Sequence, residues 1–503
     1  MATTVVDIPK LGKVKGKVFE KSNIRRFHIP YATVPKRWRV AKPVPAWQGE
    51  LDCTQQRPEC PQFAFPGDRF LQPQRVPPTY DEFNCLNVDI TAPPNLDNSS
   101  LVPSMIYIHG GSFSNKSGLF DAYDPEKFVE HSIQIGKPVV VVNVTYRLNL
   151  FGFFSSSDIK SDVEQDGETV YGNWGLNDAV KAFHWVKENI KSFGGDPNRI
   201  TGYGESAGSI ILHHLLLRPD ITFTRAILQS GVVSVMKPVS PSSYDPVWRK
   251  LLEHYQAKTV DDMRKVPAED IVKLVFEYSI SHQPLIDGAI CEDPVREYKE
   301  PGAYASLEAV IIGDCAEEGT LWSQYGDIKD TYKSYEDTVP SYLLDRFHLL
   351  YPSDVFDKDA AQAQKMVDEL VGEAMFICPI DRTAKAIAKL RPEAPLYRYR
   401  VDRTIEITHD LGAHHGIDIF FIFMNDKLTK EERVTSEKMC SDWLNFAYGE
   451  KLEETSGWNR YQLDDPSVMI YGEQATVTDM ETSRSSARCK FWEDVENASL
   501  QRS

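Results

Sequence analysis

The 503-residue sequence lacks an excess of positive charge, since 56 Lys and Arg face 73 Asp and Glu and the formal net charge is −17. A nucleic-acid partner requires a basic face, so this balance excludes that class of partner. No apolar run is long enough to span a membrane. The N-terminal residues lead into polar sequence without an apolar signal core, and the C-terminal residues carry no ER-retention or peroxisomal signal. We therefore expect a cytoplasmic protein, or a secreted one if a leader has been removed.

The chain also lacks internal repeats, Pro/Ser-rich linkers and blocks of like charge that would separate lobes. With 42% hydrophobic residues it can bury a large core. We predict a single domain over residues 1–503, with two turn-rich insertions, about residues 235–305 and 320–395, that form helical caps and set specificity.

What the chain does contain is a Gly-x-Ser-x-Gly pattern at residues 204–208, with Ser206 at its centre. This pattern is typical of a strained strand-to-helix turn that exposes a nucleophile, although chance gives roughly one match per ten chains of this length. Its surroundings favour the functional interpretation. Residues 199–203 are predicted to form a strand and residues 209–217 a buried helix, while an upstream helix over 177–193 ends in a turn at 194–198.

A serine nucleophile requires a base and donors for the developing oxyanion. The apolar run 104–108 is predicted to be a strand, and it ends in the glycine-rich segment His109-Gly110-Gly111-Ser112-Phe113. Backbone N–H groups of such a loop can approach a substrate carbonyl closely. The alternative is an ordinary glycine turn, which the presence of the Ser206 motif disfavours.

Seven blocks occur together in one order and resemble a type-B carboxylesterase, of the carboxylesterase and cholinesterase family of α/β-hydrolases, over nearly the whole chain. They are residues 28–32, 85–88, 109–113, 143–148, 172–178, 193–197 and 229–231. The resemblance implies an α/β class and an α/β-hydrolase fold, with a large, mostly parallel central sheet flanked by helices and helical cap insertions.

The resemblance also implies the acid and the base. The acid aligns with Glu318 in the block 316–320, and the alternative, Glu317, is interpreted as a solvated loop carboxylate. The base aligns with His415 in the block 412–418, and His414 is expected to point away from the site. The order Ser206, Glu318, His415 is that of an α/β-hydrolase and disfavours the two main serine-protease folds.

The family's oxyanion donors map to Gly111, Ser112 and Ala207. Ser112 departs from the usual third glycine, and its side chain adds volume near the acyl group. Three further residues match family positions close to the triad: Gly110, Glu205 and Ser230. We interpret them as groups that support His415 and an active-site water. The alternative is that they only form buried hydrogen bonds.

The predicted function is two-step acyl transfer from a small-molecule carboxylic ester to Ser206 and then to water, without cofactor or metal. The adjacent histidines His213 and His214 are not assigned to a metal, because neighbouring helical residues point about 100° apart. The sequence between Cys60 and Cys85 has no tryptophan, which disfavours a choline ester. The main alternative is a natural-product tailoring enzyme that uses the same triad for transesterification or cyclisation. A secreted lipase or sterol esterase and a non-catalytic cholinesterase-like binding protein rank lower.

Two pairs among the eight cysteines resemble bridges of secreted relatives, Cys60 with Cys85 and Cys378 with Cys489. This resemblance conflicts with a cytoplasmic location. If the protein is cytoplasmic, we expect Cys378 and Cys489 to lie close together as free thiols, both buried against Phe376 and Trp492; if it is secreted, the two pairs can form disulfides.

Overall fold

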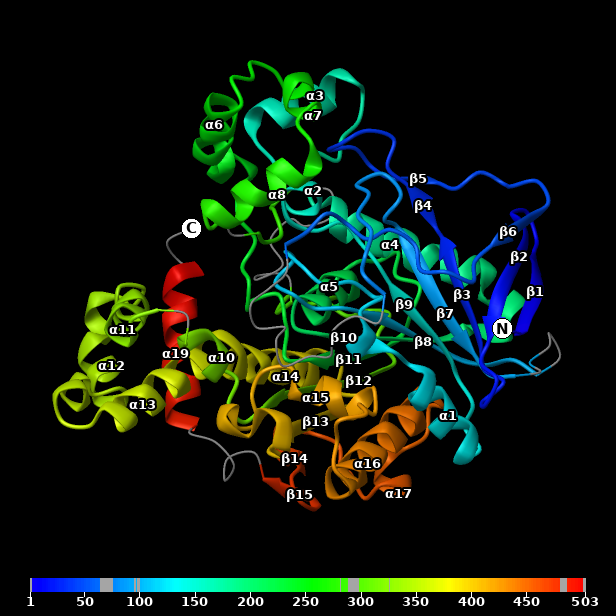
Figure 1. The fold of residues 1–503 in the computed structure, drawn as a ribbon. Coiled ribbons are helices and arrows are strands. Elements are labelled where there is room, and N and C mark those ends of the chain that lie inside the picture. The colour runs from blue at the N-terminus through cyan, green and yellow to red at the C-terminus, as the bar shows by residue number, and fades with distance from the viewer. Residues whose placement is uncertain are drawn as a thin grey trace.

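The computed structural model describes residues 2–63, 76–94, 96, 100–280, 282–287, 298–324, 326–479 and 486–500. Within these residues, thirteen strands form one sheet in the order β1-β2-β3-β7-β9-β8-β10-β11-β12-β13-β14-β15, with β6 paired to β2 (Figure 1). The central run from β9 to β14 is parallel throughout. Antiparallel pairs occur toward both edges of the sheet.

The strands have the following bounds: β1 Ala2–Ile8, β2 Gly12–Val18, β3 Arg25–Pro30, β4 Ala32–Thr33, β5 Lys42–Pro43, β6 Glu50–Asp52, β7 Asn87–Ala92, β8 Val102–Ile108, β9 Val140–Val144, β10 Gly195–Glu205, β11 Arg225–Gln229, β12 Ala309–Cys315, β13 Leu396–Val401, β14 Ser467–Tyr471 and β15 Ala475–Asp479. The short strands β4 and β5 form a separate pair.

The α-helices have the following bounds: α1 Glu126–Gln134, α2 Asn149–Gly152, α3 Ser157–Gln165, α4 Trp174–Asn189, α5 Ala207–Leu216, α6 Asp245–His254, α7 Val260–Arg264, α8 Ala268–Glu277, α10 Thr320–Ser323, α11 Ile328–Glu336, α12 Leu344–Leu350, α13 Ala360–Gly372, α14 Cys378–Leu390, α15 Ile417–Ile422, α16 Lys430–Ala447, α17 Leu452–Thr455 and α19 Ser486–Leu500. A π-helical segment, Glu373–Ile377, joins α13 to α14.

Most of the predicted elements are present, with different ends. The predicted helix 177–193 begins earlier, at Trp174, and its last turn, Ile190–Phe193, is a 3₁₀ helix. The predicted turn over 194–198 overlaps the start of β10: the chain reverses at Gly194, where φ is +89°, and β10 begins at Gly195. Pairing with β8 is irregular between Gly195 and Ile200, where Asp196 Oδ1 accepts from the Asn198 N–H at 2.8 Å. Gly195 can pair with Val102 because glycine has no β-carbon; a β-carbon at this position would lie only 2.4 Å from Ser104 Oγ.

The two faces of the sheet belong to two separate hydrophobic cores. Successive residues of β8 alternate between them: Ile106 and Ile108 lie in one cluster, and Met105 and Tyr107 lie in the other. The first cluster includes apolar residues of α4 and α5, and the second includes residues of α15 and α16. Helices therefore cover both faces, which explains why β8, β9 and β12 are buried along their whole length.

Both predicted insertions are helical where they are described. Helices α6 to α8 lie within 235–305, and α10 to α14 lie within 320–395, where a third hydrophobic cluster packs against α19 (Figure 1). The assignment of these helices as specificity caps, and the single-domain organisation, stay predictions.

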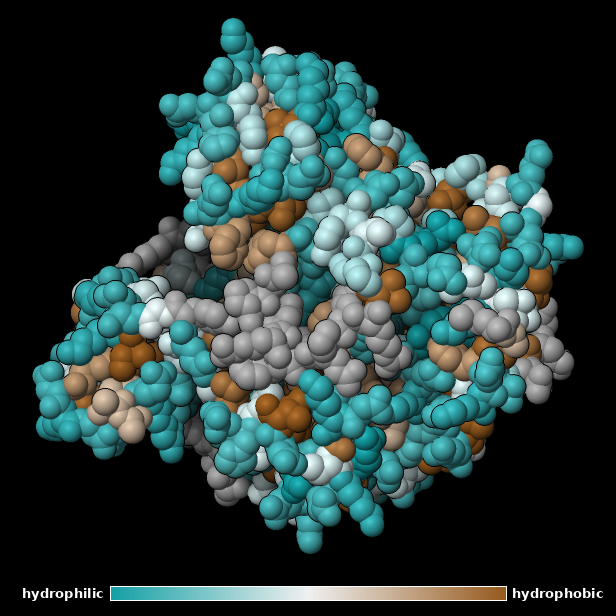
Figure 2. All heavy atoms as spheres, in the orientation of Figure 1, coloured by the Kyte–Doolittle hydropathy of each residue, from teal (hydrophilic) through white to brown (hydrophobic). Residues whose placement is uncertain are grey.

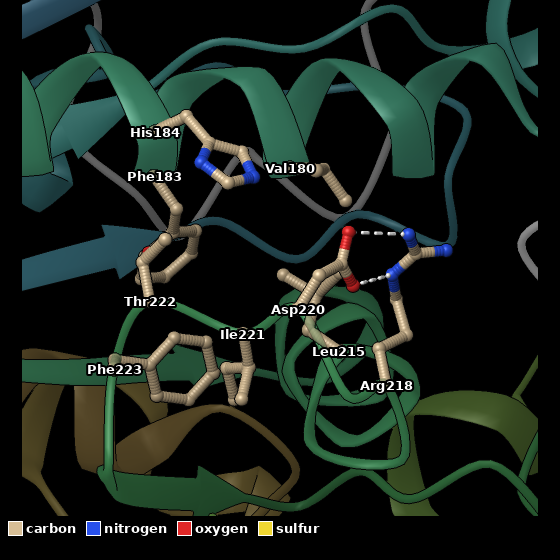
Figure 3. A pocket seen from close by; sticks show the side chains of 9 residues that line it. All are labelled: Val180, Phe183, His184, Leu215, Arg218, Asp220, Ile221, Thr222 and Phe223. Carbon is tan, nitrogen blue, oxygen red and sulfur yellow. Dashed lines mark hydrogen bonds and ion pairs between the residues drawn. The ribbon is translucent and has the colours of Figure 1, made fainter.

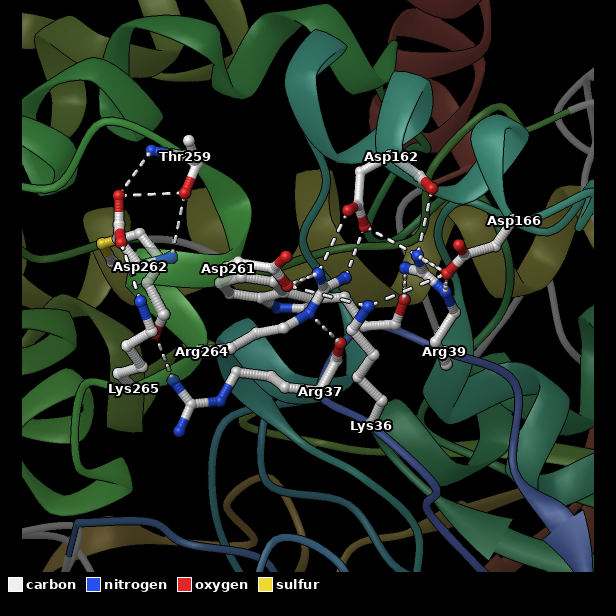
Figure 4. Close-up of polar contacts among 12 residues, drawn as sticks. Lys36, Arg37, Arg39, Asp162, Asp166, Thr259, Asp261, Asp262, Arg264 and Lys265 are labelled. Atoms are coloured by element: carbon white, nitrogen blue, oxygen red, sulfur yellow. Dashed lines mark hydrogen bonds and ion pairs between the residues drawn. The ribbon is translucent and has the colours of Figure 1, made fainter.

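Charged side chains attach the first of these helical groups to the N-terminal segment (Figure 4). Arg37 Nη1 donates to the backbone oxygen of Met263 in α7 at 2.8 Å, and Arg264 Nε donates to the backbone oxygen of Arg37 at 3.2 Å. Arg39 Nη2 lies 2.5 Å from Asp166 Oδ2, just after α3. Arg37 and Arg39 are buried, so these bonds hold α3 and α7 against one short segment.

The visible surface is mainly hydrophilic, with scattered hydrophobic residues (Figure 2). In the described part of the chain, no helix is both long and apolar enough to cross a membrane.

Candidate active site

The site forms where neighbouring parallel strands end at one edge of the sheet. In the register of the sheet, Ile108 of β8 pairs with Gly204 of β10, and Glu205 pairs with Gln229 of β11. Gln229 pairs in turn with Gly313 of β12. The residues that follow these positions therefore emerge side by side, as is usual for ligand sites in open α/β sheets.

Ser206 lies on a sharp turn between β10 and α5, with φ of +55° and ψ of −123°. This region of backbone space is unfavourable for a residue with a β-carbon, so the surroundings must enforce it. The Ser206 N–H donates to the Gln229 backbone oxygen at 2.8 Å. A β-carbon at Gly208 would lie 1.9 Å from the Ile108 backbone oxygen, and one at Gly204 would lie 2.7 Å from it. Both motif glycines are thus required for the close approach of β8.

Glu318 and His415 are brought together across 97 residues of sequence. His415 Nδ1 lies 2.5 Å from Glu318 Oε2. The other oxygen, Glu318 Oε1, accepts hydrogen bonds from Ser230 Oγ at 2.6 Å and from the Cys315 N–H at 2.7 Å. Glu318 is 1% exposed, so its orientation is determined by three polar partners. Such a carboxylate fixes the tautomer and the direction of the imidazole.

The neighbouring residues face elsewhere. Glu317 Oε2 accepts from the Ala413 N–H at 2.6 Å, so this carboxylate supports the loop before the histidines. His414 Nε2 lies 2.9 Å from Thr408 Oγ1, and burial lowers the pKa of His414 to about 4. His414 therefore points away from Glu318, as expected.

A second carboxylate lies on the far side of the His415 ring. His415 Nε2 is 3.1 Å from Glu205 Oε1, although the angle is not that of a hydrogen bond. Burial lowers the pKa of His415, but the charges of Glu318 and Glu205 outweigh this effect and raise it to about 10. Burial raises the pKa of Glu205, and the charge of His415 reverses that effect, so the net pKa is lowered. Among the described hydrogen bonds, none joins Ser206 Oγ to His415; such contacts often tighten only when substrate binds.

The glycine-rich loop after β8 has three successive residues at positive φ: Gly111 at +101°, Ser112 at +53° and Phe113 at +57°. Two carbonyls of this loop are held in place. Gly110 O lies 2.8 Å from His109 Nδ1, and Gly111 O accepts from the Ser114 N–H at 2.9 Å. In a trans peptide the N–H points opposite to the carbonyl, so the N–H groups of Gly111 and Ser112 are directed away from these anchors.

No hydrogen bond among the described residues is donated by the N–H of Gly111, Ser112 or Ala207, the first residue of α5. Gly110 brings the loop against the serine, because a β-carbon there would lie 2.4 Å from Glu205 Oε2 and 3.0 Å from Ser206 Cβ. Gly110 therefore lies against Ser206 and Glu205, and the assignment of the oxyanion donors stays a prediction.

Sequence reasoning missed three residues near His415. The Phe376 ring lies 4.4 Å from the His415 ring, centroid to centroid, and Trp322 lies at 5.8 Å. Asp418 is fully buried; its Oδ2 accepts from Gln229 Nε2 at 2.8 Å and from the Tyr399 hydroxyl at 3.0 Å. Burial and the nearby charge of Glu205 raise the pKa of Asp418 to about 7. Asp418 stands in the block that contains His415, but Phe376 belongs to the π-helical segment, which has no signal in the sequence.

Other predicted features lie apart from this site. His213 Nδ1 accepts from the Val233 N–H at 3.0 Å, and its Nε2 is 2.7 Å from the Tyr304 hydroxyl. A small pocket between α4, the end of α5 and the segment before β11 contains the Arg218–Asp220 ion pair and the His184 ring, but no member of the candidate triad (Figure 3).

The cysteine expectations are partly correct. The Cys378 thiol interacts with Cys489, which confirms that they lie close together, and Cys60 interacts with Cys85 in the same way. None of the four is joined by a disulfide bond in the structure, and their redox state stays a prediction. Cys378 and Cys489 were both expected to be buried, and this is wrong for Cys489. Cys489 is partly exposed because it lies at the edge of the third cluster, on the first turn of α19.

A largely parallel sheet covered by helices on both faces, with a serine on the turn after a central strand and a Glu–His pair on later loops, defines an α/β-hydrolase. More narrowly, the chain belongs to the carboxylesterase family, whose model matches residues 2–492, and it is an ester hydrolase of that family.

Comparisons with individual proteins agree with this assignment. The chain is 28% identical to a para-nitrobenzyl esterase of Bacillus subtilis over 93% of this chain and 94% of the relative. It is 30% identical to a fumonisin B1 esterase of Sphingopyxis macrogoltabida over 89% of this chain and 83% of the relative. A solved structure of PNB esterase superimposes with a TM-score of 0.81 at 27% identity, covering 98% of this chain and 99% of that one.

Proposed function

We propose that the protein hydrolyses small-molecule carboxylic esters by two-step acyl transfer through Ser206, His415 and Glu318. The observation that carries this proposal is the 2.5 Å contact between His415 Nδ1 and the buried Glu318 carboxylate, on the same sheet edge as Ser206. This is the arrangement that a serine nucleophile needs, because its hydroxyl is a poor nucleophile at neutral pH without a base.

In the first step His415 Nε2 takes the proton of Ser206 Oγ, which attacks the ester carbonyl carbon. The oxyanion is held by the N–H groups of Gly111, Ser112 and Ala207, and Glu318 stabilises the imidazolium. His415 then protonates the departing alkoxide as the carbonyl–oxygen bond breaks. Water, deprotonated by the same imidazole, releases the acid from Ser206 and restores the free enzyme.

Relatives named as para-nitrobenzyl esterase, phenmedipham hydrolase and lipases support an ester of a small organic molecule, and leave the natural acyl and alcohol groups open. Neither metal nor cofactor has a role in this mechanism. A cytoplasmic location stays a prediction.

The proposal is tested with nitrophenyl esters from acetyl to octanoyl. Ser206→Ala should fold normally and lose roughly 10³-fold or more in kcat. In wild type, acid-quenched protein should carry one acyl group on Ser206 by mass spectrometry. An active Ser206→Ala enzyme would refute the mechanism.

Two further measurements refine the assignment. Glu318→Gln should reduce kcat less than His415→Ala, because the acid orients the base while the base transfers the proton. If Glu317→Gln is the more damaging of the two glutamate variants, the acid has been assigned wrongly. Product analysis with an added alcohol distinguishes hydrolysis from transesterification, which would appear as a new ester.

A further inference from the structure

His282 is a buried histidine that the proposed mechanism does not use. It is 1% exposed, and its Nδ1 lies 3.0 Å from the hydroxyl of Ser114, on the glycine-rich loop. Its second ring nitrogen, Nε2, is buried and has no hydrogen-bond partner within the described residues. A polar group in this position calls for an explanation, because burial without partners costs free energy.

The segment that carries His282 is firmly attached to the body of the fold. Asn173, the residue before α4, receives the Leu285 N–H on its Oδ1 at 2.7 Å and donates from Nδ2 to the Leu285 backbone oxygen at 2.6 Å. The Val239 N–H donates to the Pro284 backbone oxygen at 3.1 Å. These bonds fix the backbone two and three residues after His282, so the imidazole approaches the loop from a rigid support.

The loop that it approaches is strained. Ser112 and Phe113 both have positive φ, a backbone conformation that is unfavourable for residues with a β-carbon. Ser114 Oγ lies 3.0 Å from the Ser112 backbone oxygen and donates to it. This bond fixes the peptide between Ser112 and Phe113, and with it the conformation of the residue whose N–H is a proposed oxyanion donor. Two groups outside the loop hold it: the Asn149 N–H donates to the Phe113 backbone oxygen at 2.7 Å, and His282 contacts the Ser114 hydroxyl.

The direction of the hydrogen bonds follows from the donors available. A hydroxyl has one proton and the Ser112 carbonyl can only accept, so one tautomer makes both contacts hydrogen bonds: Ser114 Oγ donates to the Ser112 oxygen and His282 Nδ1 donates to Ser114 Oγ. In that tautomer Nε2 is the unpartnered acceptor. Burial lowers the pKa of His282 to about 3, so the ring is neutral throughout the range in which an esterase is assayed.

We propose that His282 is a positioning residue that holds the oxyanion loop in its strained conformation, through the chain of hydrogen bonds from His282 Nδ1 to Ser114 Oγ to the Ser112 carbonyl. The proposal rests on the proposed function, because it assumes that the Gly111 and Ser112 N–H groups bind the oxyanion. His282 lies on the segment after α8 and acts on the reaction only by positioning the loop. Among the described contacts it touches neither Ser206 nor His415.

Side-chain replacements at position 282 can separate the hydrogen bond from the volume. His282→Leu removes the donor and keeps an apolar side chain of similar size. His282→Asn carries an amide nitrogen near the place of Nδ1 and should restore the bond. We expect His282→Leu to lower kcat about 3- to 10-fold, as for a lost neutral hydrogen bond, with KM changed less than twofold. His282→Asn should stay within about twofold of wild type.

A double-mutant cycle with Ser114→Ala tests the chain of bonds. If His282 acts through Ser114, the double variant Ser114→Ala/His282→Leu should lose no more activity than Ser114→Ala alone. The affinity for a trifluoromethyl ketone, which forms an oxyanion on serine, should fall in parallel with kcat/KM. The acid limb of the pH–rate profile should not move, because His415 is untouched. A merely structural defect would not produce this combination. His254→Leu, at an exposed position near the end of α6, is the matched control for the loss of an imidazole.

Unchanged kcat in His282→Leu, or additive losses in the double variant, would overturn the inference. If His282→Leu fails to fold, Ser114→Ala serves as the test, because it deletes only one oxygen atom. A Ser114→Ala enzyme with wild-type kcat and wild-type affinity for the ketone would also overturn the proposal. Activity in Ser206→Ala would instead refute the proposed function, so the two failures are distinguishable.

Discussion

The charge of Glu205 should control the pH at which the enzyme becomes active. The carboxylates of Glu318 and Glu205 raise the pKa of His415 from its ordinary value of 6.5 to about 10. A general base must be neutral to accept a proton, so kcat/KM should rise with pH until His415 has lost its proton. Glu205→Gln removes one of the two charges and keeps the size of the side chain. The imidazolium is then less stabilised, the pKa of His415 falls, and the acid limb moves to lower pH.

The size of the shift follows from the 3.1 Å distance between His415 Nε2 and Glu205 Oε1. At this distance a unit charge pair is worth about 1 kcal/mol with the dielectric constant of water and about 5 kcal/mol with an effective value near 20. One pKa unit corresponds to about 1.4 kcal/mol. Because Glu318 stays in place and Glu205 shares the effect with it, we expect a shift of about 1–2 units.

The same charge also stabilises the imidazolium that forms in the transition state. The high-pH plateau of kcat/KM should therefore fall in Glu205→Gln, by about 10- to 100-fold if the full interaction is retained there. The two effects oppose each other near neutral pH, where the variant should differ little from wild type. The variant should thus look nearly normal at pH 7 and impaired at pH 10.

The assay is kcat/KM for a nitrophenyl ester from pH 5.5 to 10.5, with spontaneous hydrolysis subtracted. Glu317→Gln is the matched control, because Glu317 contacts the Ala413 N–H rather than the His415 ring. Its acid limb should coincide with that of wild type. An unmoved acid limb in Glu205→Gln would refute the electrostatic reasoning, and equal shifts in both variants would show a general effect of charge removal.

Three other predictions concern specificity, stability and redox state. Ser112→Gly should keep activity and broaden acyl tolerance, because the backbone donor remains while the side chain is removed; an unchanged profile from acetyl to octanoyl would mean that Ser112 points away from the acyl group. Asp178→Asn should destabilise the protein by about 3–5 kcal/mol in urea unfolding, since it weakens the bidentate partner of fully buried Arg147; a loss under about 1 kcal/mol would contradict this. In protein prepared under cytosolic redox conditions, all eight cysteines should alkylate after denaturation without reductant; a Cys378–Cys489 bridge in natively sourced protein would contradict a cytoplasmic location.

Local motifs were sufficient to predict the elements that carry the site. The turn at Ser206 and the glycine-rich loop depend on steric requirements within a few residues, such as the 1.9 Å that a β-carbon at Gly208 would leave to the Ile108 oxygen. Such requirements determine the residue types and their spacing, so the strand–turn–helix unit could be predicted without any tertiary information. The ends of elements were less accurate: β10 begins at Gly195 because this residue pairs with Val102 of β8, before regular pairing resumes at Ile200.

The residue types of the site can be read from the amino-acid sequence: Ser206, two adjacent glutamates and two adjacent histidines, in the order of an α/β-hydrolase. Which of these side chains contact one another, and how their charges interact, depends on the folded chain. Glu318 reaches His415 while Glu317 holds the Ala413 backbone, and Glu205 completes the pair of charges that raises the pKa of His415. The contact of His282 with Ser114 spans 168 residues. Contacts of this kind leave no local pattern, because they depend on distances set by the register of the whole sheet and on burial that strengthens every charge within it.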